Sequence, residues 1–447
     1  YTTLFRSILG TYVINEVCFG LESLGMPREE MIPRAEKALE RLHILHLRDK
    51  ETHYTSGGEK QKIALAGVLV MEPSILLLDE PLASLDPASA REALLAFREL
   101  ADDGLSILLV EHRVEDVLRI HPERVIYMDN GRITYEGDVD GLLETADYTR
   151  IKLPAQTVLR RAKGSPWKEC HPAVPALDPT SEPLVSFQDV SFRYKADSPE
   201  VLHGINLDVR AGEVIAILGH NGSGKTTTVK QALGLLKPTS GRVLLEGVET
   251  KKITVANAAR TVGYVFQSPT QMLFAPTVRE ELAFGPENLG LTKEKVTENV
   301  NWAIKTVHLE QELPTPPLAL SFGQQKRVSI ASVLSMKSRI LMMDEPTAGQ
   351  DYWNYQSFMD TILQTPGFDA ILFITHDLDL ALTYANRVVV LYGGQVVADG
   401  SPHDVFADDE QLMQWRLVPT SLLDLNRKMY PRTGQFLRAE TLCQLAG

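Results

Sequence analysis

The chain has 447 residues, of which 44% are apolar and 23% charged, a composition that fits about two to four globular domains. Its net charge of −13 argues against a non-specific nucleic-acid binder, because a phosphate backbone requires a basic footprint, although a local basic patch stays compatible with it. Cys18, Cys170 and Cys443 are far apart and form no CxxC pair, which argues against a zinc site or disulfide framework and fits a reducing cytosol. No apolar run approaches the ~20 residues that cross a bilayer.

The first part of the chain carries three short apolar runs that predict strands. They are Ile75–Leu78, Ile107–Val110 and Val125–Met128, and each is followed by polar residues and a helical pattern. Strands that alternate with helices indicate an α/β fold whose mainly parallel sheet is covered on both faces.

A proline-rich stretch follows and predicts a linker over residues 151–183. Six prolines between Pro154 and Pro183 exclude a regular helix or a central strand. One short helix is expected around Gln156–Lys163.

The second part repeats the alternation, preceded by a glycine-rich turn. The run Val214–Leu218 predicts a strand, and Lys225–Leu236 has helical spacing. Further buried strands are predicted at Arg339–Met343, Ile371–Ile374 and Val388–Leu391.

The two parts are copies of one domain. The segment that starts at Ser56 resembles that at Ser321, an offset of 265 residues (321−56), and Asp79-Glu80 has the same offset from Asp344-Glu345 (344−79). His112 precedes His376 by 264 residues (376−112). A nearly constant offset indicates an internal duplication, because chance matches between short motifs would scatter.

The same offset predicts that the first copy is incomplete. The counterpart of Gly219 would start about 46 residues before Tyr1 (265−219), and Gln267 would fall on Thr2. We therefore expect residues 1–150 to be the C-terminal part of a truncated first copy. Residues 184–406 would form a complete second copy, and residues 407–447 a helical tail.

The turn after Val214–Leu218 has the pattern of a phosphate-binding loop. Glycines let backbone N–H groups curl around phosphate oxygens, and the following helix directs its positive end at the same charge. Lys225 would reach the β- and γ-phosphates of ATP, and the Thr226 hydroxyl would bind Mg²⁺. The predicted nucleotide-binding residues of the loop are Gly219, Asn221, Gly222, Ser223, Gly224, Lys225, Thr226 and Thr227.

Paired acids end one strand of each copy. Two carboxylates after an apolar run are costly to bury unless they bind something. Asp344 would hold Mg²⁺ and Glu345 would act as general base, while Asp79 and Glu80 are the same pair in the first copy.

A histidine follows a later strand in both copies. A lone histidine is more often a satisfied core residue than a catalytic one. Its repetition as His112 and His376 favours a shared role in contacting the γ-phosphate. Glu111 stands where the second copy has Thr375, a difference that the sequence does not explain.

A serine-led segment opens a helix 23 residues before each acid pair (344−321 and 79−56). Taken alone it predicts a helix N-cap, which is also an anion site. The residues are Ser56, Gly57, Gly58 and Glu59 in the first copy, and Ser321, Gly323 and Gln324 in the second.

In this order the motifs resemble the ATP-binding cassette (ABC) family, in which two cassettes sandwich two ATP molecules. The resemblance covers about Ile8–Thr145 and Leu184–Phe406. It implies that the two cassettes of this chain pair, with the phosphate loop of one facing the signature serine of the other. It also implies that Gln267 contacts Mg²⁺ and nucleotide.

The resemblance extends to three positions with weaker support. Tyr194 stands where the family stacks an aromatic ring on adenine, although a plain strand aromatic fits it nearly as well. Asp86 and Asp351 stand where the family's aspartate loops lie. Two positions depart from the family pattern: Phe322 replaces a signature glycine, and Glu59 replaces the signature glutamine.

Within that family the details resemble importers of the energy-coupling-factor or cobalt and vitamin type. This resemblance implies a peripheral protein on the cytoplasmic face of a prokaryotic membrane, with a membrane transmitting subunit docked near Gln267–Phe284. A small substrate-binding membrane subunit would complete the system. The cargo would be a vitamin, a vitamin precursor or a metal ion, and nucleic acid is not an expected partner. The alternatives are a soluble tandem ATPase acting on ribosomes or nucleic acid, and a regulatory module with inactive sites.

Overall fold

A computed structural model describes residues 8–55, 57–83, 85–162, 169–347, 350 and 352–446. The chain divides into two compact units, Tyr1–Thr157 and Val158–Gly447, and the border falls inside the predicted linker. Among the described residues, no helix combines the length and the apolar character that crossing a bilayer requires.

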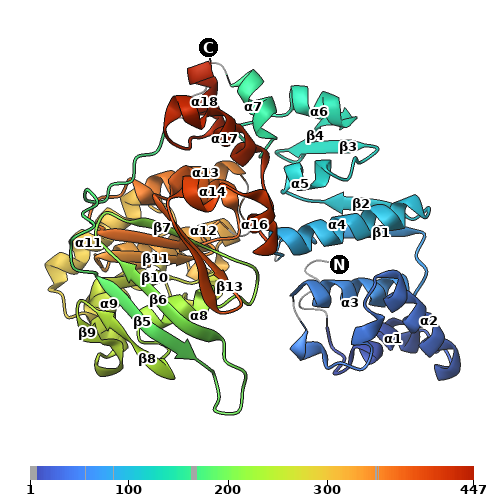
Figure 1. The fold of residues 1–447 in the computed structure, drawn as a ribbon, viewed down its shortest axis with the longest axis horizontal. Helices are drawn as coiled ribbons and strands as arrows, with labels where there is room; N and C mark the ends of the chain where they lie inside the picture. Colours follow the sequence, from blue (N-terminus) through green and yellow to red (C-terminus); the bar gives the residue numbers. More distant parts are fainter. Residues whose placement is uncertain are drawn as a thin grey trace. The chain divides into compact units, whose positions relative to one another are not determined.

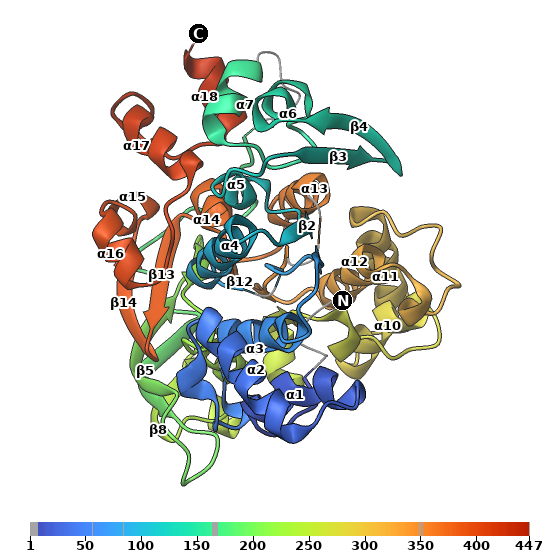
Figure 2. The same ribbon diagram turned by 90° about the vertical axis from the view of Figure 1, so that its right-hand side faces the viewer.

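The first unit contains a group of three helices and two small sheets (Figures 1 and 2). Helices α1, α2 and α3 pack on one another around a core that also takes in one face of β1. Strands β1 and β2 pair in parallel, whereas β3 and β4 form an antiparallel pair. The bounds of these elements are α1 (Val13–Ser23), α2 (Arg28–Arg41), α3 (Gly57–Leu69), β1 (Ile75–Asp79), α4 (Pro87–Asp102), β2 (Ser106–Val110), α5 (Val114–Leu118), β3 (Val125–Asp129), β4 (Arg132–Gly137) and α6 (Val139–Thr145).

Helix α7 (Ala155–Arg161) spans the border and lies where the linker helix was predicted. The second unit follows with β5 (Val185–Phe192), β6 (Leu202–Val209), β7 (Val214–Leu218), α8 (Lys225–Ala232), β8 (Ser240–Leu245), β9 (Val248–Glu249), α9 (Val255–Thr261), β10 (Val262–Val265), α10 (Val278–Asn288), α11 (Lys293–Thr306), α12 (Phe322–Leu334), β11 (Ile340–Asp344), α13 (Tyr352–Leu363), β12 (Ala370–Ile374), α14 (Leu378–Tyr384), β13 (Arg387–Tyr392), β14 (Gln395–Gly400), α15 (Pro402–Val405), α16 (Asp409–Gln414), α17 (Ser421–Thr433) and α18 (Ala439–Ala446).

Two sheets form the second unit, and the larger one confirms the predicted α/β class. Its strand order is β10-β11-β12-β7-β13-β14, with parallel pairing except at β14. A four-stranded antiparallel sheet, β6-β5-β8-β9, shares a core with one face of the large sheet and with α8. Because β7 pairs with both β12 and β13, it holds the middle of the large sheet together.

The internal duplication is visible in the backbone. Three pairs of non-glycine residues with positive φ share the 265-residue offset: His43 and His308, Glu72 and Lys337, and Glu80 and Glu345. Strand β3 also repeats the irregularity in pairing that β13 shows beside its antiparallel partner. Two copies of one domain therefore share their unusual conformations as well as their motifs.

One predicted boundary was wrong. Helix α8 ends at Ala232 and does not continue to Leu236. Gly234 adopts a φ of +69°, a left-handed conformation that commonly ends helices.

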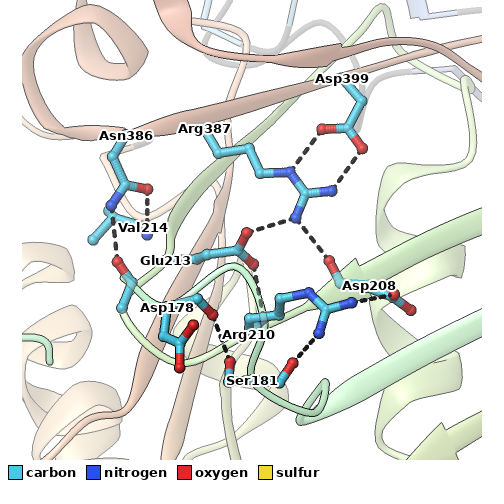
Figure 3. Close-up of polar contacts among 10 residues, drawn as sticks. Asp178, Ser181, Asp208, Arg210, Glu213, Val214, Asn386, Arg387 and Asp399 are labelled. Carbon is cyan, nitrogen blue, oxygen red and sulfur yellow. Dashed lines mark hydrogen bonds and ion pairs between the residues drawn. The ribbon is translucent and has the colours of Figure 1, made fainter. Parts of the chain in front are cut away.

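The second half of the linker packs on the second unit at the end of β7 away from the glycine-rich loop (Figure 3). Arg210 donates to the Ser181 carbonyl, and the Leu177 backbone lies so close to Gly212 that a Cβ there would come within 2.6 Å of the Leu177 Cα. Beside them Arg387 pairs with both Glu213 (2.7 Å) and Asp399 (2.6 Å). A cavity of about 600 Å³ lies among these side chains, so the linker and strand ends form a polar surface there.

The C-terminal tail is fixed by a buried ion pair. Arg438, 1% exposed, donates in bidentate fashion to Asp360 of α13 and also contacts the Tyr384 hydroxyl at 2.8 Å. Thr441 donates to Glu169 of the linker at 2.6 Å. Removing one partner of a buried pair typically costs about 3–5 kcal/mol, so the tail is an integral part of the unit.

Candidate functional site

The glycine-rich loop leaves β7 and enters α8 in the conformation that phosphate binding requires. Gly219, Gly222 and Gly224 have φ values of +147°, +85° and +99°. A Cβ at Gly224 would come within 2.5 Å of a Leu202 methyl group, and one at Gly219 would clash with the Leu391 carbonyl. Only glycine fits at Gly219 and Gly224, because the backbone turns tightly there in a crowded space.

Two polar side chains of the loop are enclosed. Lys225 donates to the carbonyls of Gly219 (2.8 Å) and His220 (3.0 Å), which keeps its ammonium inside the loop. The Ser223 hydroxyl is fully buried and has no hydrogen-bond partner among the described residues. Buried donors without partners are rare, so this hydroxyl fits an anion in the loop.

Thr226 and Asp344 bring the loop and β11 together. The Thr226 hydroxyl donates to Asp344 Oδ2 at 2.7 Å, and the Tyr264 hydroxyl donates to the same oxygen at 3.1 Å. Burial raises the pKa of Asp344 above its ordinary range, and the Thr226 hydrogen bond opposes that shift. Such a carboxylate is well placed to be held in its charged form by a bound cation.

Glu345 follows β11 in an unusual backbone conformation. Its φ is +46°, and its carboxylate Oε1 lies 2.9 Å from His376 Nδ1. Non-glycine residues seldom adopt this conformation, and those that do cluster at functional sites. The structure therefore brings two of the predicted catalytic side chains into contact.

Gln267 lies just beyond β10 and is exposed. Its backbone carbonyl accepts a hydrogen bond from Lys326 Nζ at 2.8 Å. The same ammonium reaches the Glu345 carbonyl at 3.3 Å. The sequence pattern did not single out Lys326, and burial lowers its pKa to about 8 against the attraction of Glu345 and Asp344.

The signature segment of the second unit is a helix cap. Ser321 and Gln324 form a reciprocal capping box at the start of α12, and Gln324 also donates to Glu312 at 3.0 Å. A Cβ at Gly323 would meet no atom within 4 Å, so this face of the helix start is open.

Tyr194 follows β5 at the edge of the loop. Its ring is 61% exposed, and its hydroxyl lies 3.1 Å from Thr227 Oγ1. The side chain therefore presents a free aromatic face beside the phosphate loop, where a base could stack.

In the first unit, Glu80 and His112 repeat the acid–histidine contact beside Asp79, the last residue of β1. His112 Nε2 lies 2.9 Å from Glu80 Oε1, and that hydrogen bond lowers the pKa of Glu80. The histidine uses the opposite ring nitrogen from His376. Each of the two glutamates thus contacts a histidine, and within the described residues the phosphate loop belongs to the second unit.

The Glu111 side chain has a structural role that the sequence did not indicate. It accepts from the Leu82 backbone at 2.7 Å and from the His112 backbone at 3.1 Å, and burial raises its pKa. Thr375 instead donates its backbone N–H to Ile217 of β7, a strand without a counterpart in the described part of the first unit. Glu111 thus ties the loop after β1 to the loop after β2.

The remaining predicted residues are taken one by one, each within its own unit. Ser56 and Asp351 fall outside the described residues, and Gly57 opens α3. Gly58 faces Ser89, Glu59 lies 3.6 Å from the Lys50 ammonium, and Asp86 caps α4.

The second unit fits ATP with Mg²⁺. Hydroxyl and carboxylate oxygens, as on Thr226 and Asp344, are the ligands Mg²⁺ prefers. Among the described residues no group of three or more His, Cys, Asp or Glu side chains could hold a metal by itself. Mg²⁺ would therefore need phosphate oxygens of the nucleotide as further ligands.

Comparisons with known proteins agree with this geometry. The ABC transporter family model matches residues 3–83 and 202–348. A protein of Methanosarcina mazei that carries the name ABC transporter ATP-binding protein is 33% identical over 470 residues, covering 96% of this chain and 79% of that protein. A protein of the same name from Streptococcus pneumoniae is 36% identical over 444 residues, covering 94% of this chain and 79% of that protein.

Among solved structures, the chain is similar to cbiO1 from Clostridium perfringens, described as part of the ABC transporter complex cbiONQ. It is 31% identical, with a TM-score of 0.48, and covers 60% of this chain and 99% of that chain.

Proposed function

The chain belongs to the ABC transporter family, and we propose that it is the ATP-hydrolysing subunit of an importer of the energy-coupling-factor type. The proteins of this family are ATPases. The proposed cargo is a vitamin, a vitamin precursor or a metal ion, moved by separate membrane subunits while this chain stays at the cytoplasmic face of the membrane.

The proposed roles divide the second-unit site into binding and chemistry. Backbone N–H groups of the loop and Lys225 bind the β- and γ-phosphates, and Thr226 and Asp344 hold Mg²⁺. Bound Mg²⁺ would neutralise charge on the phosphates. Glu345 takes a proton from the attacking water, and His376 orients the Glu345 carboxylate and approaches the γ-phosphate.

The observation that supports a membrane partner is an exposed aromatic pair beyond Gln267. Phe274 is 61% exposed and Phe284 is 48% exposed, and their rings meet edge to face at 4.7 Å. The buried Glu281 carboxylate accepts from the backbones of Phe274 and Ala275, both at 2.8 Å. A rigid, exposed apolar surface of this kind is typical of an interaction site.

The first unit presents the same arrangement at the same offset. Glu16 accepts from the backbones of Leu9 (2.8 Å) and Gly10 (2.5 Å), and Leu9 and Phe19 are exposed. Two equivalent surfaces in one chain suit a transmitting subunit that receives one contact from each cassette.

The test is purification of the complete protein, tagged, from detergent-solubilised membranes of its source, with its companions identified by mass spectrometry. A Phe274→Ser/Phe284→Ser variant is compared with Met413→Ser, which changes an exposed apolar side chain of α16. We expect a multi-span protein and a small membrane protein with the wild type and Met413→Ser, and their loss with the double variant. Ribosomal proteins or nucleic acid in their place would overturn the transport proposal and leave the ATPase standing.

A further inference from the structure

Lys326 is a buried cation in the second unit with a defined set of acceptors. It lies in α12, five residues after the helix cap, and its side chain is 0% exposed. Its ammonium donates to the backbone carbonyls of Gln267 (2.8 Å), Glu345 (3.3 Å) and Phe266 (3.5 Å). An ammonium has three donors, and three carbonyls accept from this one.

This arrangement carries a cost that packing alone does not explain. Burying a lysine requires desolvation of its charge, and an apolar side chain of similar length would avoid that cost. No carboxylate is within ion-pair distance of Lys326 among the described ion pairs, so the charge is held by peptide carbonyls and by the field of Asp344 and Glu345. In return for this cost, the Lys326 side chain connects two segments of backbone.

Those two segments belong to different strands of the large sheet. Phe266 and Gln267 extend from β10, and Glu345 extends from β11. Neither connection depends on the side chains of Gln267 or Glu345, because Lys326 contacts only their main chain. Beyond the last paired residues of these strands, Val265 and Met343, a single side chain therefore links the glutamine segment to the backbone of the acidic residue.

The first copy has a different residue at this position. Gln61 corresponds to Lys326 (326−265) and donates to the Pro81 carbonyl. Its Oε1 is buried and has no hydrogen-bond partner among the described residues. Among the described residues, which do not include the counterparts of Phe266 and Gln267, the amide reaches one segment of backbone and the ammonium reaches two.

We propose that Lys326 is a positioning residue for ATP hydrolysis, which holds the Gln267 segment and the Glu345 backbone at a fixed separation so that their side chains act on the same γ-phosphate. This inference deepens the proposed function and rests on the roles given there to Gln267 and Glu345. Displacing a catalytic group by about 1 Å can cost on the order of 100-fold in rate, so loss of this link should affect turnover more than binding.

The experiment measures kcat, KM and the Kd for a fluorescent ATP analogue with the full chain and Mg²⁺. Lys326→Met keeps the length of the side chain and removes its donors. Lys326→Gln supplies the residue that the first copy uses. Val333→Ala is the matched control, because it creates a cavity in the same helix away from both loops.

We expect Lys326→Met to lower kcat roughly 10- to 100-fold with KM and Kd within about threefold of wild type. Lys326→Gln should lose less, and Val333→Ala should keep kcat while lowering Tm. In a Gln267→Ala background, Lys326→Met should cost at most about threefold, because the link then has no glutamine side chain to hold at a fixed separation from Glu345.

The proposal would be overturned if Lys326→Met had the same kcat as Val333→Ala when the two variants have the same Tm. It would also be overturned if Lys326→Met lowered kcat as much in the Gln267→Ala background as it does in the wild type. If Lys326→Met does not fold, the proposal is tested with Lys326→Gln alone, against the same Val333→Ala control. Glu345→Gln is measured in parallel: unchanged turnover there overturns the general-base role, whereas loss there without loss in Lys326→Met overturns only the positioning role.

Discussion

Equivalent strands of the two copies have different environments. Met342 in β11 is 1% exposed, whereas its counterpart Leu77 in β1 is 59% exposed (342−77=265). Leu76, its neighbour in β1, is buried against α3 and α4. In the first unit one face of the strands is covered and the other is not.

The cause is the set of elements that each copy contains. In the second unit the face that bears Met342 is covered by α8 and the antiparallel sheet, and β7 fills the centre of the large sheet. The described part of the first unit has no counterpart of these elements, and its strands form two separate pairs. Apolar strands alone do not determine burial, because the cover comes from elsewhere in the chain.

The largest expected contrast is catalytic. Glu345→Gln should lower ATP turnover about 10²- to 10⁴-fold while ATP binding is kept, because the amide cannot accept the proton of the attacking water. Glu80→Gln, the same change in the first copy, should alter turnover by less than about threefold, because the described part of the first unit has no phosphate loop. Phosphate release at saturating ATP measures both, and an equal loss in the two variants would contradict the contrast.

A smaller contrast is expected in stability. Met342→Ala should destabilise the second unit by about 2–5 kcal/mol, since it leaves a cavity in a closed core. Leu77→Ala should cost less than about 1 kcal/mol, because most of that side chain already faces solvent.

All four tryptophans lie within residues 158–447, so urea unfolding followed by tryptophan fluorescence reports on the second unit. Hydrogen exchange of β1 and β2 reports on the first. A large effect of Leu77→Ala there would show that the exposed face is covered in solution.

The smallest difference between the copies is expected for one pair of glutamates, where the loss of stability should be nearly the same in both. Glu281→Gln and Glu16→Gln each replace a carboxylate that accepts two backbone N–H groups. Each should cost about 1–3 kcal/mol, because an amide oxygen accepts more weakly than a charged carboxylate. Hydrogen exchange of α10 and α1 measures the two costs. A difference of more than about 1 kcal/mol between them would show that the Glu281 and Glu16 carboxylates are not equivalent.

Much of the larger sheet could be predicted from sequence. The run Val214–Leu218 coincides with β7, and the six other predicted strands of both copies agree with the structure to within one residue at each end. Buried parallel strands are uniformly apolar, so their bounds are sharp. The antiparallel sheet was not predicted, because its strands mix buried and exposed residues irregularly.

The functional site likewise has a part that sequence motifs could locate and a part that they could not. Local motifs located the phosphate loop and the Asp344-Glu345 pair, since their spacing is fixed by a turn and a strand end. Lys326 was not singled out and the role of Glu111 was not predicted, because both side chains contact backbone atoms that are distant in sequence. A side chain that hydrogen-bonds to backbone atoms does not require a particular residue type as its partner. The sequence therefore contains no motif that would reveal the contact.

The ion pair between Arg438 and Asp360 has a consequence for the order of synthesis. The two residues are 78 positions apart, so at a ribosomal rate of about 5–20 residues per second Arg438 is made roughly 4–16 s after Asp360. During that interval the carboxylate of α13 must stay in water or meet another cation, and the helix cannot settle into its final burial. The segment around Arg438 therefore completes the packing of a helix that was made earlier, so the final burial of α13 depends on residues that leave the ribosome much later.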